Sequence, residues 1–279
     1  MKKIDNKHIY KNRVFIIAII ASVIIFGSLV HSFVSDFLQV FDINKPFAGI
    51  VAKVWFNGIG YFTKQTNLLC LIVLLIFIFK PSLFFKKSKL VMSTTIYISI
   101  TCLICWVVMA PVYAITKTAN WMNPNTMISL GLLHIVVPFM FWAWIMLIFY
   151  DKHYHFIDNK VDLKFMLLVA SIYPIVYIIY CLFINFIPMD SKLIYGYQVH
   201  NRDGSIYTET CYISIYGIIT NFNPKCCLPT FDNGTWWHDA SNQQGNPVMI
   251  TIYIGFVLII VGCILTWTLI FNHFQKHLH

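Results

Sequence analysis

The chain has 279 residues, of which 58% are apolar and only 11% are charged, and its mean hydropathy is +0.71. Soluble domains carry about 25% charged residues, so this composition excludes a soluble globular protein and predicts an integral membrane protein. A net charge of +9 would suggest nucleic-acid binding in a soluble chain, but here it is typical of lysines at a cytoplasmic membrane face. We therefore expect membrane lipids as partners and no nucleic acid; the sequence says nothing about protein partners.

Six apolar segments are long enough to cross about 30 Å of hydrocarbon as helices. They cover approximately residues 14–33, 59–79, 90–115, 126–150, 165–187 and 248–271. The first has no persuasive cleavage site for a signal peptidase, so it is kept as a span. The predicted fold is all-α: one polytopic membrane domain over residues 1–279, with six transmembrane helices. A long extracytoplasmic loop, 188–247, joins the fifth and sixth spans.

The positive charges predict the orientation of this domain. With the N-terminus inside, thirteen Lys and Arg residues fall on the inner side and seven on the outer side. Short basic segments next to the first spans have the largest effect on how a protein is oriented in the membrane. We therefore expect a multi-pass protein of the cell membrane with both termini in the cytoplasm.

The second span opens with a polar cluster in the sequence YFTKQTNLL, residues 61–69. Polar side chains next to hydrocarbon are costly unless they find partners. Thr63 and Asn67 are four residues apart and share a helix face, whereas Lys64 points elsewhere and can reach the outer interface. One interpretation is structural: Thr63 bonds to its own helix, and Asn67 ties two helices together.

The fourth span contains the sequence LLHIVVPFMFWAW, residues 132–144. Apart from His31 near the outer end of the first span, His134 is the only histidine well inside an apolar segment. Pro138 lacks the amide that would bond to the carbonyl of His134, so that carbonyl is freed and a kink is expected. His134 lies roughly 12 Å below the outer start of its span, a depth similar to that of Asn67.

The polar start of the second span supplies candidate partners for this histidine: Thr63, Thr66 and Asn67. An intramembrane ionisable residue favours a functional site, although a neutral histidine can also join helices structurally. A hydroxyl needs a base within hydrogen-bond reach to become a nucleophile, and histidine is the usual base. Thr63 and His134 meet this requirement in residue type, their depths allow contact, and Asn67 could orient the imidazole or a substrate carbonyl.

Three short stretches carry a resemblance to a known family. They are the aromatic-Phe-Thr and NLL residues of 61–69, the His-x-x-x-Pro of 134–138, and SIYPIVYIIY at 171–180. In this order the chain resembles the androgen-induced protein family of six-span membrane proteins, which includes the FAR-17a type and bacterial relatives. The resemblance covers the membrane core from about residue 61 to residue 180.

The resemblance implies an activity and two catalytic residues. Animal members of that family hydrolyse fatty acid esters of hydroxy fatty acids with an intramembrane Thr and His. By motif, Thr63 would be the nucleophile and His134 the base, with Thr66 and Asn67 nearby. The long loop at 188–247 has no counterpart in the animal members.

Three cysteines lie in that loop: Cys211, Cys226 and Cys227. On the outer side of the membrane they permit one disulfide, between Cys211 and either Cys226 or Cys227. The loop has no C-x-x-C spacing, so no metal site is predicted, and no cofactor is expected.

Other functional classes fit the sequence less well. A transporter would carry buried charges along a path or broken helices in paired halves, and these spans hold almost no charge between their ends. We therefore favour a lipid-ester hydrolase. The alternative is a non-catalytic scaffold or binding protein in which the Thr-Asn-His cluster is structural. An acyltransferase would use the same pair of residues with another acceptor.

Overall fold

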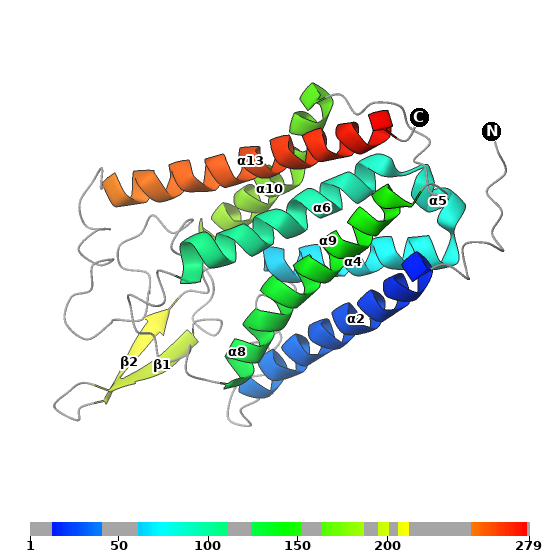
Figure 1. Cartoon of the computed structure of the whole chain (residues 1–279). Coiled ribbons are helices and arrows are strands. Elements are labelled where there is room, and N and C mark those ends of the chain that lie inside the picture. Colours follow the sequence, from blue (N-terminus) through cyan, green and yellow to red (C-terminus); the bar gives the residue numbers. More distant parts are fainter. Residues whose placement is uncertain are drawn as a thin grey trace.

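The structure is a computed structural model that describes residues 13–40, 61–110, 124–151, 163–186, 195–200, 206–211 and 247–277. Within these ranges the chain is almost entirely helical, and six helices are long and apolar enough to cross a membrane. They lie side by side as one elongated bundle (Figure 1). The expected number of spans is confirmed. The predicted starts lie within three residues of the observed helix starts, the first and last helices continue six or seven residues beyond their predicted ends, and the predicted end of the third span lies outside the described residues.

Each span corresponds to one helix or to a series of helical segments. In chain order these are α2 (Arg13–Val40), α4 (Phe62–Phe79), α5 (Pro81–Phe85), α6 (Ser88–Leu103), η2 (Ile104–Met109), α8 (Pro124–Gly131), η4 (Leu132–Val136), α9 (Val137–Tyr150), α10 (Leu163–Phe186) and α13 (Pro247–His277). The segments η2 and η4 are single turns of π-helix inside the third and fourth spans.

One hairpin departs from the all-α prediction. Strands β1 (Tyr195–His200) and β2 (Ile206–Cys211) pair antiparallel, with Tyr195 opposite Cys211. The hairpin belongs to the 188–247 segment and lies at the end of the bundle where α8 begins (Figure 1). Cys226 and Cys227 lie outside the described residues, so the disulfide with Cys211 stays a prediction.

Helix α6 is the centre of the bundle. In its apolar stretch 72% of the residues are buried, against 22% for α10 and for α13, and it lies between α13 and α9 (Figure 1). We attribute the burial of α6 to its many hydroxyl side chains, because a hydroxyl that faces lipid is costly. The buried hydroxyl residues of this helix include Ser93, Thr94, Thr95, Ser99 and Thr101. Three of them donate to the carbonyl four residues earlier in the helix, at 2.7 to 2.8 Å.

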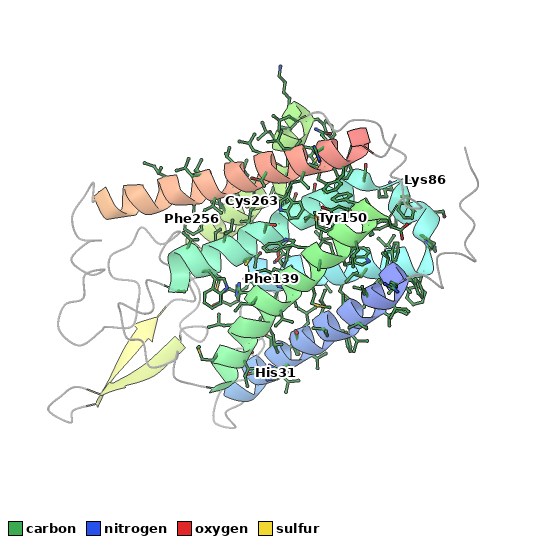
Figure 2. The ribbon with its side chains drawn as sticks, in the orientation of Figure 1. His31, Lys86, Phe139, Tyr150, Phe256 and Cys263 are labelled. Carbon is green, nitrogen blue, oxygen red and sulfur yellow. The ribbon has the colours of Figure 1, made fainter. Side chains whose placement is uncertain are left out.

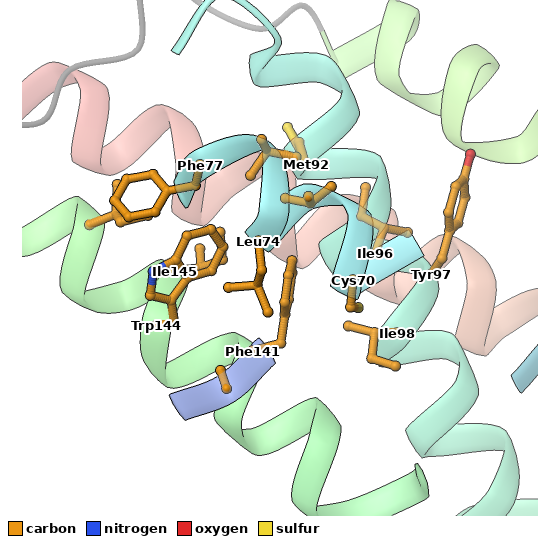
Figure 3. Packing of buried hydrophobic residues seen from close by; sticks show 14 of the residues in the cluster. Cys70, Leu74, Phe77, Met92, Ile96, Tyr97, Ile98, Phe141, Trp144 and Ile145 are labelled. Atoms are coloured by element: carbon orange, nitrogen blue, oxygen red, sulfur yellow. The ribbon is translucent and has the colours of Figure 1, made fainter. Parts of the chain in front are cut away.

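Aromatic side chains fill one end of the bundle. Phe77 of α4 lies edge-to-face on Phe84 of α5 and on Trp144 of α9, with ring centroids 5.1 and 5.2 Å apart. The short α5 thus turns back under α4, and its Phe84 and Phe85 are 1% exposed. Leu74 and Ile145, also fully buried, extend this core toward the bundle centre (Figure 3). Basic residues such as Lys86 mark the same end (Figure 2).

Ser99 joins three helices through one hydroxyl. The indole N–H of Trp142 on α9 donates to Ser99 Oγ at 3.0 Å, and that of Trp267 on α13 donates at 2.7 Å. Ser99 Oγ itself donates to the carbonyl of Thr95 at 2.7 Å. One donor and two acceptor sites are all that a serine hydroxyl has, so its capacity is fully used.

We expect Ser99→Ala to destabilise the bundle by about 1 to 3 kcal/mol, because two indole donors lose their acceptor in an apolar environment. The matched control is Ser28→Ala, since Ser28 is also buried but, among the described residues, bonds only to the carbonyl of Ile24 in its own helix. Thermal unfolding in detergent, followed by tryptophan fluorescence, compares the two variants. Equal melting temperatures would contradict the bridging role of Ser99.

Candidate functional site

The polar cluster predicted at the start of the second span forms the first two turns of α4. Thr66 and Asn67 are completely buried, and Thr63 is 7% exposed. On one side this part of α4 faces α6 and η4, and on the other side it faces α10. The cluster therefore lies inside the bundle and not on its lipid-facing surface.

The side-chain amide of Asn67 connects α4 to the fourth span. Its Nδ2 donates to the carbonyl of Thr63 at 2.7 Å and to the carbonyl of Leu133 at 3.3 Å. Carbonyl oxygens only accept, so the orientation of this amide follows from its neighbours. The first bond links Asn67 to its own helix, and the second reaches the residue directly before His134.

Thr66 and Thr101 connect α4 to α6. Thr66 Oγ1 donates to the carbonyl of Thr63 at 2.9 Å and lies 2.9 Å from Thr101 Oγ1. A hydroxyl has one hydrogen, and that of Thr66 is used on Thr63. The hydroxyl of Thr101 must therefore be the donor to Thr66.

His134 also contacts Thr101, through the backbone. Its Nδ1 lies 3.4 Å from the carbonyl oxygen of Thr101. Since the carbonyl can only accept, this contact requires the tautomer with hydrogen on Nδ1. The other ring nitrogen, Nε2, then carries a lone pair and is the basic nitrogen.

Both helices that supply these contacts contain a π-helical turn beside the site. Pro138 is the second residue of α9, directly after η4. The carbonyl of His134 accepts a hydrogen bond from the indole of Trp106 in η2 at 3.2 Å. The turn before Pro138 is thus a π turn, and the carbonyl that proline leaves free accepts from the neighbouring helix; the expected kink stays a prediction. Such π turns occur frequently at functional sites.

Tyrosines of α10 pack against the other side of the start of α4. The hydroxyl of Tyr173 donates to Gln65 Oε1, and the amide of Phe62 donates to the hydroxyl of Tyr177 at 2.9 Å. The Phe62 ring also stacks on Tyr173 with ring centroids 5.1 Å apart. Both tyrosines belong to the 171–180 stretch. The three stretches that carry the resemblance therefore meet at α4.

The structure joins most of the predicted site residues into one network. Asn67 reaches the residue next to His134, and Thr66 reaches the residue whose carbonyl faces the imidazole. The pairing of the Thr63 hydroxyl with the imidazole stays a prediction. Sequence reasoning did not single out Thr101 or Trp106, because α6 carries several hydroxyl residues and an alignment of helix faces cannot say which one meets His134.

Metal binding at this network has no support within the described ranges, where no three His, Cys, Asp or Glu side chains are close enough to hold an ion. The network consists of hydroxyls, an amide, an indole and one imidazole. Such groups suit proton transfer and hydrogen bonding to a neutral ligand.

Comparisons with known proteins find two bacterial relatives. The chain is 26% identical over 212 residues to the uncharacterized protein MG133 of Mycoplasma genitalium, which covers 64% of this chain and 76% of the relative. It is 28% identical over 207 residues to the uncharacterized protein MG452 of the same organism, covering 70% of this chain and 71% of the relative. No family model and no solved structure matches the chain.

We expect Asn67→Asp to destabilise the protein by about 3 kcal/mol or more, because a carboxylate cannot donate to the two carbonyls and its charge is buried. Asn67→Leu should cost less, since it removes the donors but adds no charge. Thermal unfolding of both variants and of the unchanged protein in the same detergent measures their relative stabilities. Variants as stable as the unchanged protein would show that Nδ2 does not hold these carbonyls.

Proposed function

We propose that the chain is a hydrolase of lipid esters in a bacterial cell membrane, with Thr63 as nucleophile and His134 as base. The observation that carries this proposal is the contact of His134 Nδ1 with the Thr101 carbonyl. A backbone acceptor on one imidazole nitrogen holds the ring in the tautomer whose other nitrogen is a base, which is the arrangement that general-base catalysis needs.

The proposed reaction has two steps. Thr63 Oγ1 attacks the ester carbonyl carbon while His134 Nε2 accepts the hydroxyl proton, and the imidazolium returns this proton to the leaving alcohol. Water then attacks the acyl-threonine with His134 again as base, which releases the fatty acid and restores the hydroxyl. Asn67 and Thr66 both donate to the carbonyl of Thr63, so they would hold the nucleophile's backbone in place.

The same proposal includes the orientation of the protein in the membrane. Lys64, in the first turn of α4, lies at the other end of that helix. Among the described residues, six other basic side chains at helix ends gather at the end of the bundle that holds the start of α2 and the α4–α6 connection. These residues are Arg13, Lys80, Lys86, Lys87, Lys89 and Lys164. If this end faces the cytoplasm, both termini are inside and the site lies in the outer half of the membrane.

Fusion reporters test the orientation. Green fluorescent protein attached after residue 279 should fluoresce, because it becomes fluorescent only in the cytoplasm. Alkaline phosphatase attached at the same point should be inactive, because it becomes active only outside the cytoplasm. Phosphatase inserted between β1 and β2 should be active. The opposite pattern would place the site in the inner leaflet half and contradict the proposed topology.

Labelling by a fluorophosphonate probe, which reacts with activated hydroxyls, tests the catalytic pair. We expect the purified protein to be labelled at Thr63, and Thr63→Ala and His134→Ala to lose at least about 90% of the signal, as expected for a hydroxyl that needs its base. The controls are Thr268→Ala and His31→Ala. Among the described residues, the buried hydroxyl of Thr268 bonds to a carbonyl of its own helix, and His31 is a histidine of the first span.

A second candidate is a non-catalytic protein in which the same network holds three helices together. The bonds from Asn67 to Leu133 and from Thr66 to Thr101 favour it, because both cross between helices as structural polar contacts do. A well-folded protein that the probe does not label at all would support this candidate and oppose the hydrolase.

A further inference from the structure

The direction of every hydrogen bond in the network can be assigned. Asn67 Nδ2 donates both of its hydrogens to carbonyls, Thr66 donates its hydroxyl hydrogen to the carbonyl of Thr63, and Thr101 donates its hydroxyl hydrogen to Thr66 Oγ1. His134 places its Nδ1 hydrogen on the carbonyl of Thr101, and Trp106 places its indole hydrogen on the carbonyl of His134. These donors all point into the protein.

What remains in this network is a set of acceptors. Asn67 Oδ1 is completely buried and has no hydrogen-bond partner among the described residues. With its Nδ1 hydrogen donated to the Thr101 carbonyl, His134 carries a lone pair on Nε2. Turning the Asn67 amide over would not help, because its oxygen would then face two carbonyl oxygens at 2.7 and 3.3 Å.

A buried amide oxygen without a donor is costly, and native proteins provide a partner for most such atoms. In hydrocarbon no bulk water can do so. The missing partner must therefore be a donor that reaches the bundle interior. An ester or ketone carbonyl cannot be that partner, because it only accepts.

We infer that Asn67 Oδ1 is an acceptor site that binds the O–H group of a neutral ligand. The O–H group belongs either to a lipid alcohol or to water. The inference names a ligand for the site of the proposed function, and there it would supply the alcohol or the hydrolytic water. It also means that Asn67 does not donate to a substrate carbonyl.

Binding of a matched pair of lipids tests the inference. The full chain is placed in phosphatidylcholine nanodiscs, whose lipid has no O–H donor, and its melting temperature is followed while dioleoylglycerol or its methyl ether is added. The two lipids differ only in the hydroxyl hydrogen and a methyl group. We expect the alcohol to bind about five- to thirty-fold more tightly than the ether, as the loss of one buried hydrogen bond predicts.

Variants and an experimental density map complete the test. Asn67→Leu should abolish the difference between alcohol and ether, and the control His31→Ala should keep it. If alcohol and ether behave alike, a solvent-sized density at hydrogen-bond distance from Asn67 Oδ1, in nanodiscs without dioleoylglycerol, identifies water as the donor. No preference for the alcohol and no such density would overturn the inference, and neither requires the leucine variant to fold.

The binding test and the labelling test fail separately. Loss of fluorophosphonate labelling with retained preference for the alcohol would leave an acceptor site without a nucleophile. Labelling without that preference and without density at Asn67 would leave the nucleophile but remove the acceptor site.

Discussion

The arrangement of this protein depends on the cost of placing polar groups in hydrocarbon. Helix α6 carries buried hydroxyls along much of its length, and a helix of this composition could not face lipid without leaving them poorly solvated. It is therefore enclosed by other helices, and its hydroxyls bond to its own carbonyls or to its neighbours. Ser99 accepts from α9 and α13, and Thr101 donates to α4. The positions of these neighbouring helices follow from these bonds.

The two ends of the bundle are stabilised in different ways. Near the α4–α6 connection, aromatic rings of α4, α5 and α9 pack edge to face, and α5 seals that end with two buried phenylalanines. Near the start of α4 the contacts are polar, with hydroxyl, amide, imidazole and indole groups from α4, α6, η2, η4 and α10. Apolar packing tolerates small shifts, whereas a hydrogen-bond network requires defined distances, so the second end is the better place for chemistry.

The directions of the bonds connect structure with the proposed activity. A network in which all donors point inward rigidifies three helices and at the same time leaves the Asn67 oxygen without a partner among the described residues. The two interpretations, structural and functional, thus do not exclude each other at the level of individual contacts. Thr66 can hold helices together while the Thr101 carbonyl selects the tautomer of His134. The π turns η2 and η4 fit this picture, since each places its residues one position away from regular helical geometry.

Much of this protein could be predicted from the sequence, for physical reasons that apply to single segments. The length and apolarity of a span depend only on its own residues, so the six helices and their starts were predictable to within a few residues. The polar start of α4, His134 and the proline four residues later also stand out locally, because each is unusual in hydrocarbon. The hairpin β1–β2 was missed, since a polar loop carries no membrane signal.

Which residues meet across the bundle was decided only by the tertiary structure. Thr101 is one of several hydroxyl residues on α6, and its sequence neighbours do not distinguish it from Thr94 or Thr95. The rotation of α6, set by all its polar contacts together, turns Thr101 toward α4 and Ser99 toward the indoles. The unpartnered oxygen of Asn67 likewise became visible only when both carbonyls facing its nitrogen were known. Sequence determines which polar groups enter the membrane, and packing determines which of them remain to bind something else.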